Sequence, residues 1–275
     1  MPEGPEIRIA ADKVFAAIGV KPLEKVWFEF PQLKCYEQEL VGQSVKSIET
    51  RGKAMLTHFS NELTLYSHNQ LYGRWIIKSR GCLPKTNRAL RLALHNSSKC
   101  ALLYSATDIE IHTPQTLKNH PFLCKLGPDI LNPDLSVEGV SNRLQSKRFK
   151  RRSLGSIYLD QTFLAGLGNY LRSEILHVSG RNPHENPCNL NPNQLYNLSL
   201  QTLEISKRSY IKKGVTVEPK AAAILKSSGQ SYSQYRFWVF SREHKPCRVC
   251  ASPVKKIIHS GRNLFYCESC QPREA

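Results

Sequence analysis

The chain has 275 residues, of which 40% are hydrophobic, a composition typical of folded globular domains rather than of disordered segments. This length is sufficient for two or three small domains, each with its own core. Lys and Arg number 39 against 22 Asp and Glu, which gives a formal net charge of +17. This excess favours a polyanionic partner, because each neutralised phosphate releases condensed counterions. The sequence shows neither a membrane-spanning apolar run nor a secretory signal, so we expect a cytoplasmic protein.

The basic residues are spread along the chain. An anionic membrane surface would favour a single basic amphipathic helix, whereas a long nucleic-acid surface needs cations on several elements. The positions are Arg51, Lys53, Arg74, the run 147–152, Lys212, Lys213, Lys255 and Lys256. Nucleic acid is therefore the favoured partner.

The N-terminal half predicts one helix followed by short strands. Apolar residues recur at helical spacing after Pro5, namely Ile7, Ala10, Ala11, Val14 and Ile18. Between Val26 and about His112, short β-branched or aromatic runs predict strands at 26–28, 45–48, 63–66, 75–77, 90–94 and 101–104. Regularly spaced short strands indicate a β-sandwich or barrel.

The C-terminal half predicts helices and then a cysteine-rich module. Residues 119–133, with three prolines and a glycine, predict an interdomain linker. Helical periodicity dominates residues 136–213, apart from a proline-containing loop at 180–193. Residues 214–235 are rich in Ser, Gly, Lys and Ala and predict a mobile connection. We therefore predict a multidomain α+β protein.

Two Cys-x-x-Cys pairs are separated by residues 251–266, a spacing typical of a four-cysteine tetrahedral zinc site. A redox motif would need only one pair, in a βαβ context. We predict one structural Zn²⁺ bound by Cys247, Cys250, Cys267 and Cys270. Between the pairs, the runs 254–258 and 264–266 predict a β-hairpin whose tip presents Gly261 and Arg262. Its arginine is either solvated or a phosphate ligand.

Two further features have both an ordinary and a functional interpretation. Gly166-Leu-Gly168-Asn169 predicts an interhelical turn capped by Asn169, where free backbone N–H groups either meet water or hold a DNA phosphate. Removal of Met1 would leave Pro2 with a free secondary amine beside Glu3. The positive end of a helix disfavours the protonated amine, and the neutral amine is the nucleophile. The alternative is an ordinary chain end.

Several segments together resemble the formamidopyrimidine-DNA glycosylase and endonuclease VIII family, in particular its endonuclease VIII branch. They are Met-Pro-Glu-Gly-Pro-Glu-Ile at the N-terminus, Arg51-Gly-Lys53, His68-Asn-Gln-Leu-Tyr-Gly73, residues 159–170 and the four-cysteine finger. The resemblance extends over nearly the whole chain. It implies an N-terminal catalytic β-sandwich with a flanking helix at 1–125, a helix-two-turn-helix domain at 126–235 and a β-hairpin zinc finger at 236–275.

The resemblance also implies roles for individual residues. Pro2 would be the Schiff-base nucleophile, Glu3 the general acid, and Lys53 a cation near the lesion phosphate and sugar. A flipped-out base leaves a gap in the stack. The residues that would fill this gap as a wedge are Gln70, Leu71 and Tyr72.

Three more residues are implied to contact DNA. Asn169 and Arg262 would hold the phosphates that flank the flipped nucleotide, with Arg262 also promoting the second elimination. Lys125 stands where related sequences tend to carry arginine, so it keeps the charge but loses the bidentate fork.

The resemblance thus implies a bacterial base excision repair enzyme, a bifunctional DNA glycosylase and AP lyase that removes oxidised pyrimidines and cleaves by β,δ-elimination. Its partner would be double-stranded DNA containing oxidised bases or abasic sites. We expect a monomer associated with the nucleoid, with no catalytic metal. One alternative is the oxidised-purine enzyme, which generally has a Met, Arg and Phe wedge; Gly4 and Gln70-Leu-Tyr72 favour the pyrimidine branch. The other is a non-catalytic zinc protein that binds damaged DNA.

Overall fold

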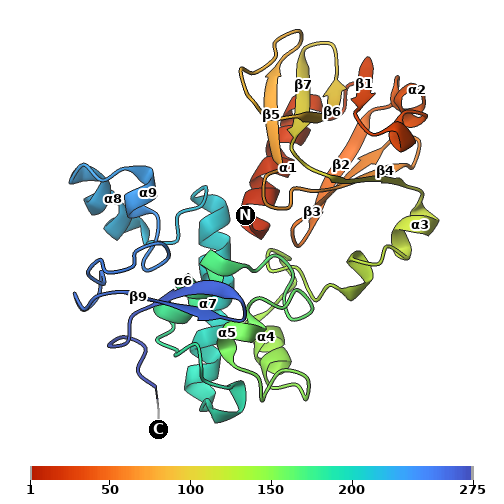
Figure 1. Cartoon of the computed structure of the whole chain (residues 1–275). Helices are drawn as coiled ribbons and strands as arrows, with labels where there is room; N and C mark the ends of the chain where they lie inside the picture. Colours follow the sequence, from red (N-terminus) through yellow and green to blue (C-terminus); the bar gives the residue numbers. More distant parts are fainter. Residues whose placement is uncertain (1, 274–275) are drawn as a thin grey trace. The chain divides into compact units, whose positions relative to one another are not determined.

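The computed structural model describes residues 2–273, so Met1, whose removal is predicted above, lies outside the described residues. Contacts divide the chain into two compact units, Met1–Lys125 and Leu126–Ala275, and each is described by itself. In Figure 1 the first unit is coloured from red to yellow-green and the second from green to blue. The cysteine-rich segment shares the second unit with the helices. The three-domain division stays a prediction.

The first unit is a sandwich of two antiparallel four-stranded sheets, with the strand orders β1-β6-β7-β5 and β2-β3-β4-β8. Their inner faces share one apolar core, in which Phe28 and Leu103 of one sheet pack with Phe59 of the other. The strands are β1 (Lys25–Phe28), β2 (Val45–Arg51), β3 (Ala54–Phe59), β4 (Thr64–His68), β5 (Arg74–Ser79), β6 (Leu90–His95), β7 (Lys99–Tyr104) and β8 (Asp108–His112). The predicted sandwich is confirmed.

The predicted strands did not include β3 and β8. Strand β3 lies between β2 and β4, and its side chains are buried on both faces. Met55 faces the sandwich core, whereas Leu56 belongs to an outer cluster covered by Leu117 and Phe122. A strand with apolar side chains on both faces lacks the alternation that identifies a half-buried strand. Helices α2 (Tyr36–Leu40) and α3 (Pro114–Lys118) and 3₁₀ turns at Pro31–Leu33 and Leu123–Lys125 complete the unit.

Helix α1 (Gly4–Ile18) packs against strands of both sheets and begins at the N-cap residue Glu3. The backbone N–H of Glu3 donates to Glu6 Oε2 at 3.1 Å, and its carbonyl accepts from the Ile7 N–H at 3.1 Å. At the other end, Gly19 forms a bridge with Val45 at the start of β2. Helix α1 and β2 are both about 22 Å long. The start of α1 therefore lies near the end of β2, as Figure 1 shows.

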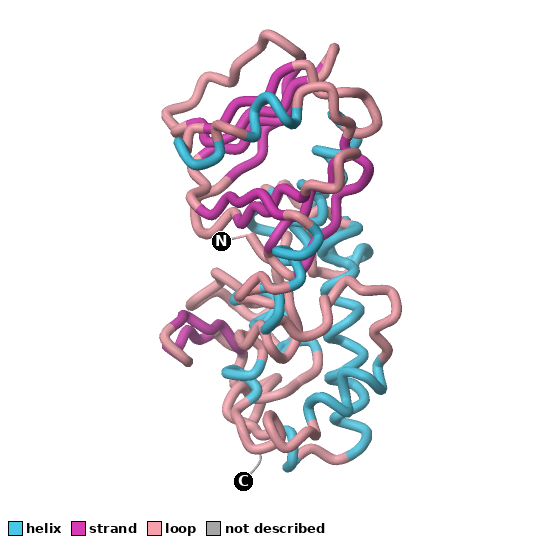
Figure 2. The backbone as a smooth tube through the Cα atoms, turned by 90° about the vertical axis from the view of Figure 1, so that its right-hand side faces the viewer, coloured by secondary structure: helices cyan, strands magenta, loops and turns pink. Residues whose placement is uncertain are grey.

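The second unit consists of helices and one β-hairpin. Figure 2 shows the strands in magenta, in the first unit and in this hairpin. Its core joins Leu144, Ile175 and Leu198 from three helices. The elements are α4 (Val137–Leu144), α5 (Leu154–Ile157), α6 (Asn169–Val178), a 3₁₀ turn at Pro187–Asn189, α7 (Pro192–Ile211), α8 (Pro219–Ser227), α9 (Tyr232–Tyr235), β9 (Lys255–His259) and β10 (Arg262–Tyr266). The predicted α+β class is confirmed.

The expectation of a mobile connection at residues 214–235 is wrong. This segment contains helices α8 and α9. The run Ala221-Ala-Ala-Ile-Leu has high helix propensity. Gly214 and Gly229, both with positive φ, mark the turns before and after α8. The Ser and Gly content that suggested a linker thus belongs to helix ends.

The hairpin β9–β10 confirms the predicted strands between the cysteine pairs, with Arg262 opposite His259 beside a two-residue turn. Ser260 and Gly261 both have positive φ, 51° and 72°, as a type I′ turn requires. Leu264 and Tyr266 join the helical core, while Phe265 packs with the cysteine cluster. The hairpin is therefore buried on both faces at its base.

A buried carboxylate joins α6 to the chain that leads into the cysteine-rich segment. Glu174 is fully buried, and its Oε1 accepts from the backbone N–H groups of Val239 at 3.0 Å and Phe240 at 2.9 Å. Its Oε2 accepts from the Trp238 N–H at 2.8 Å and from the Thr216 hydroxyl. Three consecutive N–H groups form an anion-binding concavity. Glu174 satisfies all three.

Across residues 2–273, no helix combines the length and the apolar character needed to cross a bilayer.

Replacing Glu174 should destabilise the second unit. Glu174→Ala leaves three N–H groups without their acceptor, so we expect the free energy of unfolding to fall by about 3 kcal/mol or more, with Glu174→Gln intermediate. Urea denaturation followed by circular dichroism measures this. The control Glu204→Gln changes an exposed glutamate of α7 and should shift stability by less than about 0.5 kcal/mol. Equal losses for the Ala variant and the control would contradict the role assigned to Glu174.

Candidate active site and DNA interface

One end of the first unit collects Pro2, Glu3 and Lys53, whereas Arg262, the other residue predicted to take part in the chemistry, lies in the second unit. Pro2 precedes α1, and Glu3, the N-cap, is only 2% exposed. Lys53 lies in the turn between β2 and β3, at the end of β2 toward which α1 begins. It is 7% exposed, so it is not an ordinary surface lysine. Neighbouring positions in the fold thus hold Pro2, a buried carboxylate and a buried ammonium group.

His68 connects this end to the loop that follows β4. It pairs with Ala54, the residue after Lys53. Burial lowers the pKa of His68; the Asp108 carboxylate opposes this shift, and the charge of Lys53 adds to it. The neutral imidazole can accept a hydrogen bond, and its Nδ1 accepts the backbone N–H of Gln70 at 3.1 Å.

The predicted wedge, Gln70, Leu71 and Tyr72, lies on a fixed loop with exposed side chains. Gln70 adopts a positive φ of 50°, and its Oε1 accepts from the Thr107 hydroxyl at 2.7 Å. The Arg88 guanidinium donates to the Tyr72 carbonyl at 2.5 Å. Leu71 is 55% and Tyr72 66% exposed. An apolar and an aromatic side chain held outward on a fixed backbone suit insertion into a base stack.

A cluster of one glutamate and two histidines lies near this loop, on β8 and the segment that follows it. Glu110, His112 and His120 have ligand atoms close enough for a metal ion. However, His120 Nδ1 accepts the N–H groups of Phe122 and Leu123 at 3.2 and 3.3 Å. The ring proton therefore sits on Nε2, which faces Glu110 Oε2 at 3.6 Å with an N–H rather than a lone pair. We interpret this cluster as a contact that fixes the segment after β8.

In the second unit, the interhelical turn differs from its prediction. Gly168, not Asn169, is the N-cap of α6, and Asn169 is the first helical residue. Its side chain turns to the hairpin, where Nδ2 donates to the Asn263 carbonyl at 2.6 Å. The prediction of Asn169 as cap is therefore wrong, because a partner distant in sequence binds its amide. The contact brings Asn169 and the strand of Arg262 together, and Arg262 itself is exposed.

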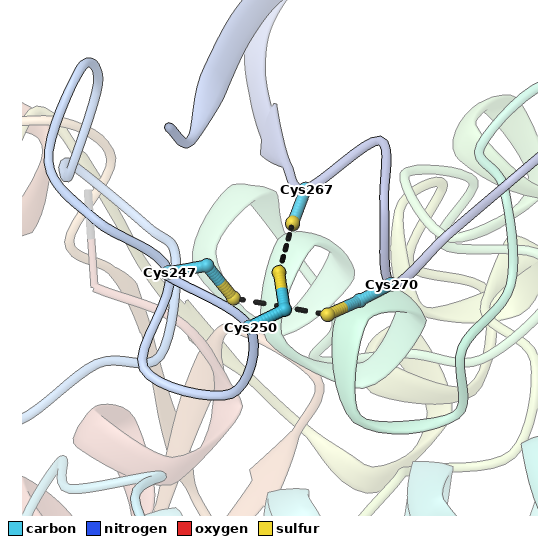
Figure 3. Close-up of side chains that lie close together, drawn as sticks. All are labelled: Cys247, Cys250, Cys267 and Cys270. Carbon is cyan, nitrogen blue, oxygen red and sulfur yellow. Dashed lines mark hydrogen bonds between the residues drawn. The ribbon is translucent and has the colours of Figure 1, made fainter. Parts of the chain in front are cut away.

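The four predicted cysteines converge, as Figure 3 shows. All four Sγ atoms lie within 4.8 Å of one another, with Cys247 and Cys270 at 3.8 Å and Cys250 and Cys267 at 3.4 Å. Tetrahedral zinc with Zn–S bonds near 2.3 Å places its sulfurs about 3.8 Å apart. The donor set fits a structural Zn²⁺ with no open position for a substrate.

The sequence reasoning missed Arg172 and Glu174, whose buried charges contact the hairpin and the segment before it. Arg172 and Glu174 stand in a helical run of mostly apolar residues, where charge at a buried position was the available signal. Lys125, at the end of a 3₁₀ turn, is exposed as a DNA contact requires.

Comparisons with known proteins agree with this arrangement. Models of the formamidopyrimidine-DNA glycosylase N-terminal domain, its H2TH domain and the zinc finger found in FPG and IleRS match residues 1–107, 126–220 and 245–273. Endonuclease 8 of Escherichia coli K12 is 51% identical over 98% of this chain and 100% of its own length. Endonuclease 8 of Shigella sonnei is 50% identical over the same shares.

Solved structures show the same fold. Lactococcus lactis Fpg bound to DNA with an abasic site is 20% identical, with a TM-score of 0.81 over 98% of this chain and 100% of that one. The same protein with DNA containing an oxidised pyrimidine gives 18% and 0.80, over 99% and 100%. The chain therefore belongs to the formamidopyrimidine-DNA glycosylase and endonuclease 8 family of base excision repair DNA glycosylases with AP lyase activity.

Proposed function

We propose that this protein removes oxidised pyrimidines from duplex DNA through a Schiff base on Pro2 and then cuts the strand by β,δ-elimination. The observation that carries the proposal is the position of Pro2 directly before α1, with the buried carboxylate of Glu3 beside it. The positive end of the helix favours the neutral amine, which is the nucleophilic form. The similarity to endonuclease 8 supports the choice of reaction.

In this mechanism the Pro2 nitrogen attacks the sugar C1′ while the bond from C1′ to the damaged base breaks. Glu3 supplies a proton, either to the sugar oxygen as the ring opens or to the departing base. Once the sugar ring has opened, the resulting iminium acidifies the C2′ protons, and loss of one C2′ proton expels the 3′ phosphate. The conjugated iminium then loses its C4′ proton, which expels the 5′ phosphate. Lys53 is a cation for the charge of the lesion phosphate. The product is a one-nucleotide gap with phosphate ends.

Each remaining predicted residue has a place on the DNA in this proposal. Leu71 and Tyr72 fill the space of the flipped base, with Gln70 beside them. Asn169 and Arg262 hold flanking phosphates, and Arg262 also promotes the second elimination. Lys125 contributes charge to the surface. The large positive charge of +17 supports such a surface.

We also propose that the protein acts as a monomer on the nucleoid DNA of a bacterial cytoplasm. The endonuclease 8 relatives named above are bacterial proteins. The two contacts proposed for the flanking phosphates need no second subunit, because both come from one unit of this chain.

The nucleophile is tested by borohydride trapping. The purified protein, incubated with a duplex bearing one oxidised pyrimidine, should give a covalent adduct at Pro2, read by mass spectrometry of its peptides. Retention of Met1 should abolish the adduct because it blocks the amine, whereas the control Pro84→Gly, in a surface loop, should trap normally. Tight binding with neither adduct nor cleavage would favour the non-catalytic alternative.

The wedge is tested with Leu71→Ala. If Leu71 fills the gap, its loss should slow excision from duplex DNA roughly tenfold, because flipping costs a few kcal/mol. Excision from single-stranded DNA with the same lesion should change much less. Single-turnover kinetics on both substrates measure this, with Leu83→Ala, another exposed loop leucine, as control. Equal slowing on both substrates would contradict insertion.

Zinc removal should weaken DNA binding without altering the proposed catalytic residues of the first unit. A chelator extracts the ion that links the two cysteine pairs, and the hairpin of Arg262 lies between them. We expect one zinc per chain by elemental analysis, and loss of duplex affinity as it is removed. Cys35→Ser, which alters an exposed cysteine of the first unit, should keep its zinc. Full zinc retention in Cys267→Ser would exclude the four-cysteine site.

A further inference from the structure

Arg172 of α6 is among the largest fully buried side chains in the part of the chain that the structure describes. Its Nη1 donates to the carbonyls of Gly155 at 3.0 Å and His259 at 3.2 Å. Its Nη2 donates to Asn169 Oδ1 at 2.5 Å and to the Asn263 carbonyl at 3.3 Å. One planar group thus joins α5, the start of α6 and both strands of the hairpin.

The two hairpin carbonyls bracket Arg262. His259 is the last residue of β9, Asn263 is the second residue of β10, and the turn and Arg262 lie between them. A hairpin with only a two-residue connection can pivot as a unit about its base, so hydrogen bonds to both strands next to the turn fix its direction. Arg262 is exposed at the end of this fixed segment.

The same guanidinium determines which way the amide of Asn169 points. Arginine can only donate, so the atom that it contacts must be the carbonyl oxygen of the amide. The amide nitrogen then faces the Asn263 carbonyl, to which it donates one hydrogen. Its second hydrogen is left for an acceptor such as a phosphate oxygen. Arg172 and the Asn263 carbonyl thus hold the amide from both sides, and without Arg172 only the contact to Asn263 would fix it.

The geometry of these contacts is specific to arginine. The guanidinium supplies a rigid planar fork with several donors, which no other side chain reproduces.

We propose that Arg172 is a positioning residue that aligns the Asn169 amide and the Arg262 hairpin as one phosphate clamp. The inference rests on the proposed function, in which Asn169 and Arg262 hold the flanking phosphates. Arg172 itself does not touch DNA. Arg172 holds Asn169 of α6 and Arg262 of the hairpin in place, so that both can contact the DNA phosphates at the same time.

The test measures binding to a duplex carrying a tetrahydrofuran abasic analogue, which cannot be cleaved. Dissociation constants from fluorescence anisotropy are taken over a series of KCl concentrations for Arg172→Met, Arg172→Lys and Arg172→Gln. The control is Arg208→Met, which removes a guanidinium bound to the Thr216 carbonyl in the same unit. Thermal denaturation of each variant reports the loss of stability. Borohydride trapping on a duplex bearing one oxidised pyrimidine, at saturating concentration, reports the chemistry at Pro2.

We expect Arg172→Met to weaken binding about tenfold to hundredfold, and the slope of log affinity against log salt to fall by about one to two. Arg172→Lys should behave like the Met variant, because one ammonium cannot span four acceptors. Trapping at saturation should reach the wild-type yield. The Arg208→Met slope should equal that of wild type even if its stability falls.

A wild-type salt slope in all three Arg172 variants would overturn the proposal and leave Arg172 a structural residue. A wild-type slope in Arg172→Lys alone would also overturn it, because charge rather than alignment would then suffice. If the Met variant does not fold, the Lys and Gln variants decide the question. Failure of the wild-type protein to form an adduct would instead refute the proposed chemistry, and the binding comparison would still judge the clamp.

Discussion

The carboxylate of Glu174, buried against three consecutive backbone N–H groups, is the interaction on which the second unit depends. It fixes the point where the chain leaves the helices for the cysteine-rich segment. From there the hairpin packs Leu264 into the helical core and Phe265 against the cysteines. The zinc site then closes the segment on itself. A module with only a small core of its own is thus stabilised by packing against the helical core on one side and by a metal ion on the other.

The first unit solves a different problem, the placement of reactive groups at a chain end. An N-terminus is ordinarily mobile. Here the residue after Pro2 caps a helix whose apolar face lies in the sandwich core. Because the bridge between Gly19 and Val45 sets the direction of α1 along β2, Pro2 and the turn of Lys53 share one end of the unit. The position of the proposed nucleophile therefore follows from helix packing.

Sequence reasoning reached the features that depend on local pattern. Helix α1, the sandwich strands other than β3 and β8, the cysteine pairs and the β-hairpin between them all carry their signals within a few residues. Strand β3 was missed because burial on both faces removes alternation. The cap was misassigned because the Asn169 amide binds a carbonyl 94 residues away. Glu174 and Arg172 were missed for the same reason, since their partners are distant in sequence.

Sequence also left the catalytic and binding assignments dependent on resemblance. Pro2, Lys53 and Leu71 are common residues, and no local pattern distinguishes a nucleophile from a chain end or a wedge from a loop. The structure adds the exposure of these side chains, which the sequence pattern does not give. Lys53 is buried, whereas Leu71 and Tyr72 are exposed. Those opposite exposures are what the two roles require.

The two-sided burial of β3 has a consequence for motion. A central strand covered on both faces is among the last parts of a domain to open, and its amide hydrogens exchange slowly with solvent. Lys53 is joined directly to this strand, whereas Leu71 and Tyr72 stand on an exposed loop beyond β4. The proposed wedge side chains can thus change rotamer on their fixed loop, while Lys53, the proposed cation at the lesion, keeps its place beside a strand that opens slowly. Burial and side-chain freedom are thus divided between residues at the same end of two neighbouring strands.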